Sequence, residues 1–268
     1  CLMRLFLWAM ALILAAQTAP ASAKSLPTVF LAEMTSPEVG RALQQGVRTI
    51  IIPTGGIEQG GPHLVLGKHN HIVRRAAAAL ARALGDALVA PVMVYVPEGP
   101  VDPPQGHMAF PGTISLPEPV FQSVLEAAAR SFKAHGFRQI LLLGDSGGNQ
   151  RGQGRVAAKL SREWAGGGIG VLHISDYYDP EANGQFDWLR RNGLAAAAKS
   201  GHADLRDTSE LLAAHAKGVR NDMIAKAGSD RGVTGNPKGA SPVLGDRLLQ
   251  LKFAAALAQV RRWRAGHE

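Results

Sequence analysis

Apolar runs alternate with amphipathic stretches along most of the chain. Short apolar runs of the kind that forms buried parallel strands cover residues 47–53, 87–96, 139–143 and 168–175. Apolar residues recur with helical spacing over residues 70–84, 120–135, 155–164 and 248–264. Because strands alternate with helices, the pattern predicts an α/β fold, a three-layer αβα sandwich with a mostly parallel sheet.

Histidines, acidic residues and glycines gather in the segments that follow the predicted strands. These segments are residues 55–71, 97–113, 144–149 and 176–179. In open parallel sheets, ligands bind outside the carboxyl ends of the strands. We therefore expect a functional site where these segments meet.

The first residues have the pattern of a secretory signal peptide. Arg4 precedes an apolar run over residues 5–16, and Ala21 and Ala23 supply small residues before Lys24. The run is shorter than the roughly 20 apolar residues of a membrane-spanning helix. We expect residues 1–23 to be removed, which leaves residues 24–268 as a single α/β domain in the periplasm or outside the cell.

Composition narrows the chemistry of the site. Cys1, in the predicted signal peptide, is the only cysteine in the sequence, so a metal would need His, Asp, Glu or water as ligands. The net charge is +8, but the densest basic cluster, at residues 261–264, contains a single aromatic residue. A nucleic-acid surface would interleave more aromatics with its basic residues, so we expect neither a nucleic-acid partner nor, after cleavage, a membrane partner.

The segment after the first predicted strand is the first candidate site. Within residues 58–71 the sequence places Glu58, His63, His69 and His71. A carboxylate and several imidazoles suit a divalent metal. The alternative is that these side chains make ordinary polar contacts.

The segment Gly-Asp-Ser-Gly-Gly-Asn at residues 144–149 is the second candidate. It looks like the nucleophile segment of trypsin-like proteases, but that fold is all-β. It also fits Gly-x-Ser-x-Gly, the nucleophile elbow of α/β-hydrolases, because a predicted strand precedes it and a helix follows. Ser146 would then be a nucleophile. The alternative is a glycine-rich turn that lets the backbone approach a ligand.

Residues 201–209 are the third candidate. His202 and Asp207 lie five positions apart where a loop meets a helix. On spacing alone, Asp207 or Thr208 would cap that helix.

The three candidate segments and a further segment at residues 110–116 resemble, in their order along the chain, the motifs of the creatininase (creatinine amidohydrolase) family. The family carries Glu-Gln-His-Gly-Pro-His-Leu where residues 58–64 read Glu-Gln-Gly-Gly-Pro-His-Leu, and Phe-Pro-Gly-Thr-Ile-Ser-Leu at residues 110–116. Where residues 144–149 read Gly-Asp-Ser-Gly-Gly-Asn, the family carries Asn-Gly-His-Gly-Gly-Asn. Where residues 202–209 read His-Ala-Asp-Leu-Arg-Asp-Thr-Ser, the family carries His-Ala-Gly-x-x-Glu-Thr-Ser. The resemblance spans residues 31–220 and implies a homo-oligomer that hydrolyses a small molecule with metal bound.

The departures from the family fall on the dinuclear metal centre that the resemblance implies. Glu58 matches the first ligand, whereas Gly60 stands where a His is expected. His69 replaces an Asp, and Asp207 replaces a longer Glu. Ser146, with Asp145 beside it, replaces the second family His. The site is therefore either rebuilt or decayed.

We predict a rebuilt site. Its expected groups are the metal ligands Glu58, His69, Asp145 and Asp207, the proton carriers His202 and His107, and the substrate contacts His63, Ser146, Gly147 and Asn149. The expected cofactor is a divalent metal, zinc or manganese. The expected reaction is hydrolysis of a non-peptide C–N bond, as in a cyclic amide or formamide. Two alternatives remain, a non-catalytic periplasmic binding protein and a serine hydrolase using Ser146.

Overall fold

A parallel four-stranded sheet forms the centre of the computed structural model, which describes residues 27–266. The strands lie in the order β2-β1-β3-β4. They are β1 (Thr49–Thr54), β2 (Ala87–Val89), β3 (Gln139–Gly144) and β4 (Gly170–His173). All three strand pairs are parallel, with Ile50 of β1 opposite Leu88 of β2 and Ile140 of β3. The predicted sheet is thereby confirmed.

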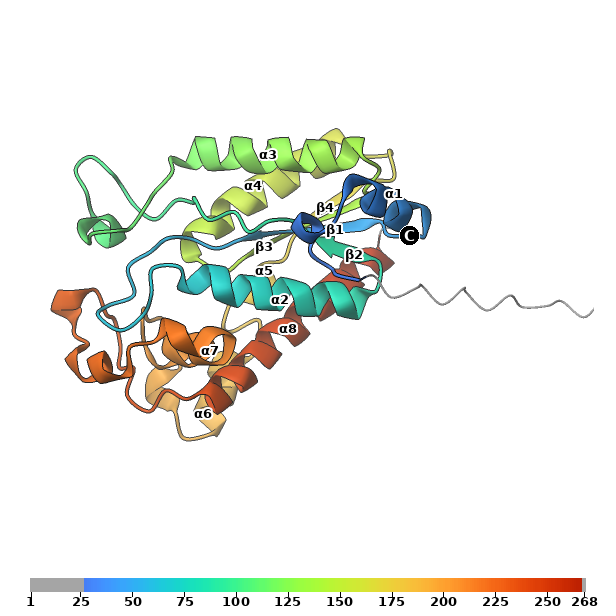
Figure 1. Cartoon of the computed structure of the whole chain (residues 1–268). Coiled ribbons are helices and arrows are strands. Elements are labelled where there is room, and N and C mark those ends of the chain that lie inside the picture. The colour runs from blue at the N-terminus through green and yellow to red at the C-terminus, as the bar shows by residue number, and fades with distance from the viewer. Residues whose placement is uncertain (1–26, 267–268) are drawn as a thin grey trace, which may run out of the picture.

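Helices cover both faces of this sheet (Figure 1). The α-helices are α1 (Ser36–Gln44), α2 (Lys68–Leu84), α3 (Glu118–Ala134), α4 (Gly147–Glu163), α5 (Ser175–Tyr178), α6 (Gln185–Arg191), α7 (Leu205–His215) and α8 (Pro242–Ala265). Short 3-10 helices are η1 (Leu31–Glu33), η2 (Gly106–Ala109), η3 (Ala195–Ala197), η4 (Ala216–Gly218), η5 (Asn221–Lys226) and η6 (Ser229–Arg231). Within residues 27–266, none of these helices combines the length and the apolar character needed to cross a membrane.

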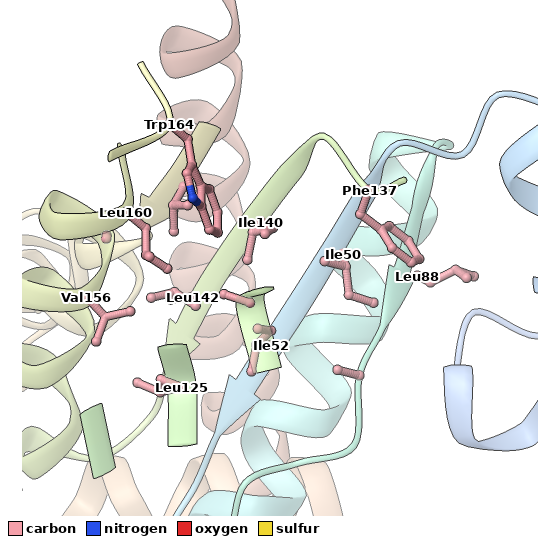
Figure 2. Packing of buried hydrophobic residues seen from close by; sticks show 14 of the residues in the cluster. Ile50, Ile52, Leu88, Leu125, Phe137, Ile140, Leu142, Val156, Leu160 and Trp164 are labelled. Carbon is pink, nitrogen blue, oxygen red and sulfur yellow. The ribbon is translucent and has the colours of Figure 1, made fainter. Parts of the chain in front are cut away.

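Alternating side chains of the strands supply the two cores. Ile50 and Ile52 of β1 point to the face covered by α1, α3 and α4, where they share a core with Leu125 of α3 and Leu160 of α4, and Figure 2 shows Ile50 beside Phe137 and Leu88. Ile51 points to the opposite face, which α2 and α8 cover. Because both faces are covered, every residue of β1 is buried, as in other parallel sheets.

Several element boundaries differ from those predicted, and three of them lie in segments that lead to the carboxyl ends of the strands. The apolar run over residues 87–96 pairs as a strand only to Val89, because Pro91 has no N–H to donate to a ladder. Helix α4 begins at Gly147 rather than at residue 155, since its glycine-rich first turns carry no amphipathic signal. Helix α2 begins at Lys68, and this places Lys68 and His69 on its first turn.

Candidate functional site

The loops after β1, β2 and β3 open on one cavity of about 740 Å³. Glu58 comes four residues after β1, Asp145 follows β3 directly, and Glu98 and His107 lie in the loop after β2. The carboxyl ends of parallel neighbours meet at one edge of the sheet, which brings these groups together. The turn before α7 adds His202 to the same wall.

Glu58 is the centre of the site and is 4% exposed. Its Oε2 atom accepts hydrogen bonds from Lys68 Nζ at 2.6 Å and from His69 Nε2 at 2.8 Å. Its Oε1 atom lies 3.0 Å from His107 Nε2 and 3.9 Å from His202 Nδ1. The carboxylate thus has one side filled by protein cations and another facing two histidines.

The His69 ring joins two carboxylates. Its Nε2 contacts Glu58, and its Nδ1 lies 2.9 Å from Asp145 Oδ2. Burial and the Lys68 ammonium oppose its charge, but the hydrogen bonds to Asp145 and Glu58 raise the pKa of His69 to about 9. At neutral pH it is therefore an imidazolium with both N–H groups in use.

Asp145 is held from its other side by Lys252 and Tyr177. Its Oδ1 atom accepts from Lys252 Nζ at 2.6 Å and from the Tyr177 hydroxyl at 2.7 Å. Burial opposes ionisation, but Lys252 and His69 lower the pKa of Asp145 to about 2. Lys252 Nζ also donates to Glu210 Oε2 at 3.0 Å, so one ammonium serves two buried carboxylates.

Asp207 fixes the turn that carries His202. Its Oδ2 atom accepts from the backbone N–H of Ala203 at 2.8 Å, and Ala203 has the left-handed φ of 53°. A non-glycine residue in this region is strained, and strained residues cluster at functional sites. The cap of α7 is Asp204, which accepts from the backbone N–H groups of Arg206 and Asp207, so neither Asp207 nor Thr208 has the capping role.

The predicted ligands Glu58, His69, Asp145 and Asp207 do not surround one point. Glu58 and Asp145 bind opposite nitrogens of the same ring, and Asp207 faces the backbone of Ala203. We expected carboxylates crowded together without a cation, whereas Lys68, His69 and Lys252 separate them. The physical reason is that the chain neutralises these buried charges with its own side chains.

A different group has the geometry of a metal site. Within residues 27–266, the cluster of at least three potential ligands is Glu58, His107 and His202, whose ligand atoms all lie within 4.8 Å of one another. Ligand atoms about 2.1 Å from a tetrahedral zinc are about 3.4 Å apart, which falls between the two distances measured from Glu58 Oε1. Two His and one Glu are also a known catalytic zinc set.

Gln59 supports one of these histidines as a ligand and constrains the other. His202 Nε2 lies 2.8 Å from the Gln59 carbonyl oxygen, which can only accept, so Nδ1 keeps its lone pair toward Glu58. His107 Nδ1 faces the Gln59 side-chain amide nitrogen at 3.0 Å. Binding of a metal through His107 Nε2 therefore requires that amide to turn and present its oxygen. In its present orientation the amide donates to the Gly232 carbonyl and accepts from the Gly61 N–H, so the turn would exchange these two bonds for the fit of the three residues to a divalent ion.

Glu98 is a cavity carboxyl that sequence analysis did not single out. It is 6% exposed, its Oε2 accepts from Ser146 Oγ at 3.2 Å, and its buried Oε1 has no partner among the described residues. Burial, reinforced by the negative charge of Glu58, raises the pKa of Glu98 to about 7. The sequence signal that could have identified Glu98 is its place within residues 97–113, one of the segments expected to line the crevice.

Glu98→Gln should change how stability depends on pH. The pKa of Glu98 is raised from 4.5 to about 7, so its contribution is complete below pH 4.5 and is lost as pH rises through 7. Glutamine does not ionise. The free energy of unfolding of the variant, relative to that of the parent protein, should therefore rise by ~3 kcal/mol between about pH 5 and pH 8. Urea unfolding of metal-free protein at both pH values measures this gain. Glu118→Gln, at the cavity rim, is the control, and equal pH profiles for both variants would contradict the prediction.

Ser146 does not have the geometry of a nucleophile elbow. It precedes α4 with an ordinary extended backbone (φ −109°, ψ 150°), and its hydroxyl donates to Glu98. An elbow serine sits in a strained turn and contacts a histidine.

Ser146→Ala should therefore leave hydrolase activity within about tenfold of the parent, under roughly 1.4 kcal/mol in the barrier. Steady-state kinetics checks this on whichever substrate is turned over. A loss of several orders of magnitude in a folded variant would support the serine-hydrolase alternative.

The four predicted substrate contacts separate into two pairs. Ser146 and Gly147 line the cavity. His63 and Asn149 are 0% exposed and support the backbone instead. His63 Nε2 pairs with Thr208 Oγ1 at 3.0 Å, and Asn149 Nδ2 donates to the carbonyls of Thr54 and Gly55. Because the side chains of His63 and Asn149 are fully buried, they do not reach the cavity where the predicted contact with substrate would occur.

Lys68 and Lys252 were also missed, although the sequence carries a signal for each. Both stand at the spacing of buried helix positions, Lys68 four residues before Ile72 and Lys252 midway between Leu248 and Ala256. A lysine in an apolar stripe needs a buried partner. Its partner here lies in a distant segment, so the sequence does not name it.

Known proteins resemble the chain over most of its length. The family model described as creatinine amidohydrolase matches residues 32–260. The mycofactocin precursor peptide peptidase of Mycolicibacterium smegmatis is 25% identical over 247 residues, covering 83% of this chain and 88% of that protein. The family-model match covers all three candidate segments.

Solved structures agree in fold. A mutant creatininase has a TM-score of 0.71 at 22% identity and covers 88% of this chain and 98% of its own. A manganese form of creatininase has a TM-score of 0.68 at 22% identity with the same coverage, and a zinc form of a mutant has 0.66. At this identity the likeness concerns the fold alone.

Proposed function

The chain belongs to the creatininase family, and from this premise we propose that it is a metal-dependent hydrolase of a non-peptide C–N bond in a small molecule. Cyclic amides and formamides are the proposed substrate class. Creatinine itself is not favoured, because the site departs from the family motifs at several positions. Family membership supports the hydrolase class, whereas the substrate and the need for metal are our proposal.

The convergence of Glu58, His107 and His202 in the cavity carries this proposal. Zinc and manganese are the proposed ions, since imidazole suits zinc and carboxylate oxygen suits both. A bound divalent ion would supply Lewis acidity to polarise a carbonyl group. Burial, followed by the Lys68 charge, lowers the pKa of His202 to about 4, which keeps this ring neutral at pH 7 as a metal ligand must be.

Glu98 is the residue we propose for proton transfer, in place of His107 or His202. Its Oε1 atom is free, and Ser146 holds its Oε2 atom. A carboxyl with a pKa of about 7 can hold or accept a proton at neutral pH. The two histidines, in contrast, are needed at Glu58.

Chelation is the test of this proposal. We expect protein loaded with Zn²⁺ or Mn²⁺ to hydrolyse at least one member of a panel of lactams, hydantoins and N-formyl compounds. Dipicolinate should remove the activity and the ion together, and added metal should restore both. His202→Ala should bind no metal, whereas His135→Ala, on the exposed end of α3, should behave as the parent.

Two results would redirect the interpretation. Metal binding without turnover of any panel member would favour a binding protein, for which the internal neutralisation of the carboxylates is the supporting observation. Turnover that survives complete metal removal would contradict the metal-dependent proposal.

Export and assembly are further proposals. The pattern over residues 1–23 supports secretion with Lys24 as the new N-terminus, but it lies outside the described residues. The resemblance to creatininases supports a homo-oligomer. N-terminal sequencing and sedimentation of the secreted protein would test the two proposals.

A further inference from the structure

We infer that this site takes one divalent ion rather than two, because Lys68, His69 and Lys252 already occupy the carboxylate oxygens that a second ion would need. The inference rests on the proposed function.

The buried groups form an unbroken chain of alternating charge. Along it, a cation lies between each pair of successive carboxylates, at hydrogen-bond distances of 2.6–3.0 Å. The order is Lys68, Glu58, His69, Asp145, Lys252, Glu210. A second divalent ion in this chain would have to displace one of these side chains from its carboxylates and leave it buried without a partner, which is costly in the protein interior.

Asp145 has no oxygen left for a metal. Its Oδ2 atom faces the His69 ring, and its Oδ1 atom accepts from both Lys252 and Tyr177. The Lys252 ammonium also lies 4.4 Å from the centre of the Tyr177 ring, a further cation–π contact. An ion at Asp145 would have to displace an ammonium that is fixed by three groups.

Glu58 has one oxygen free of these cations. Lys68 and His69 share Oε2, whereas Oε1 faces the two histidines. The open coordination positions therefore lie around Oε1, next to His107 and His202, and they suit a single ion.

Metal content provides the test. Protein dialysed against Mn²⁺ and then against metal-free buffer should contain one Mn²⁺ per chain by mass spectrometry. Its electron paramagnetic resonance spectrum should lack the coupling that a neighbouring second Mn²⁺ would cause. Lys252→Ala leaves Asp145 and Glu210 without their cation and opens space between them, so this variant should hold a second Mn²⁺, which favours oxygen ligands. Lys159→Ala, which removes an exposed lysine paired with Glu126, should still hold one.

The outcomes separate the inference from the proposed function. Two ions per parent chain, with coupled spectra, would overturn the inference and leave a metal-dependent hydrolase intact. No ion would overturn both. A folded Lys252→Ala variant that still binds a single ion would show that the ammonium does not exclude the second. If Lys252→Ala does not fold, the count and spectrum of the parent protein still decide between one ion and two.

Discussion

Glu58→Gln should abolish metal binding and reduce hydrolysis at least about a thousandfold, which corresponds to ~4 kcal/mol in the barrier. The amide keeps the shape of the side chain but loses the charge that holds the ion between His107 and His202. Changes in residues that merely orient metal ligands cost 10–100-fold in affinity, so loss of a ligand should cost more than about a hundredfold. Equilibrium dialysis with Zn²⁺ measures the affinity, and turnover at saturating metal measures the activity.

The matched control is Glu118→Gln. Glu118 lines the same cavity, but it pairs with Gln122 and Arg151 at the rim rather than with the histidines. This variant should keep its metal affinity within about tenfold, ~1.4 kcal/mol. Equal metal affinity of Glu58→Gln and the parent would remove Glu58 from the proposed site.

Lys252→Met should destabilise the metal-free protein by about 3–5 kcal/mol in the free energy of unfolding. Methionine fills similar space, but it leaves Asp145 and Glu210 buried without their shared ammonium. Urea unfolding at neutral pH measures the loss. Lys159→Met is the matched control and should cost less than about 1 kcal/mol, because Lys159 forms an exposed pair. A loss below about 1 kcal/mol in Lys252→Met would show that the buried chain does not depend on this cation.

The same variant should also lose part of its acid sensitivity. Lys252 and His69 lower the pKa of Asp145 from 3.8 to about 2, so its contribution to stability is present above pH 3.8 and is lost as pH falls toward 2. Without Lys252 the folded-state pKa should rise toward or above its ordinary value. The difference in stability between parent and variant should therefore narrow as pH decreases through that window. A constant difference down to pH 2 would contradict this assignment.

Much of the fold and part of the site could be predicted from sequence alone. Continuous apolar runs such as the one containing Ile50 and Ile52 can only be buried, and their alternation with helical periodicity specifies a parallel sheet. Because the carboxyl ends of such strands meet, the segments containing Glu58, His107 and Asp145 were expected in one crevice. The family resemblance also came from these local motifs, each of which is contiguous in the chain.

Only the tertiary structure decided which of these groups lie close enough together to hold a metal and which share a protein cation. Lys252 lies 107 residues from Asp145, and sequence spacing cannot show that α8 brings it within 2.6 Å. With Lys252 and Lys68 in the site, the His69 ring lies between Glu58 and Asp145 and is hydrogen-bonded to both. Charge neutralisation in a buried network depends on every group within a few ångströms, wherever it lies in the chain. The sequence therefore determined the fold and the location of the crevice, whereas packing of the distant helix α8 against it determined the state of its charged groups.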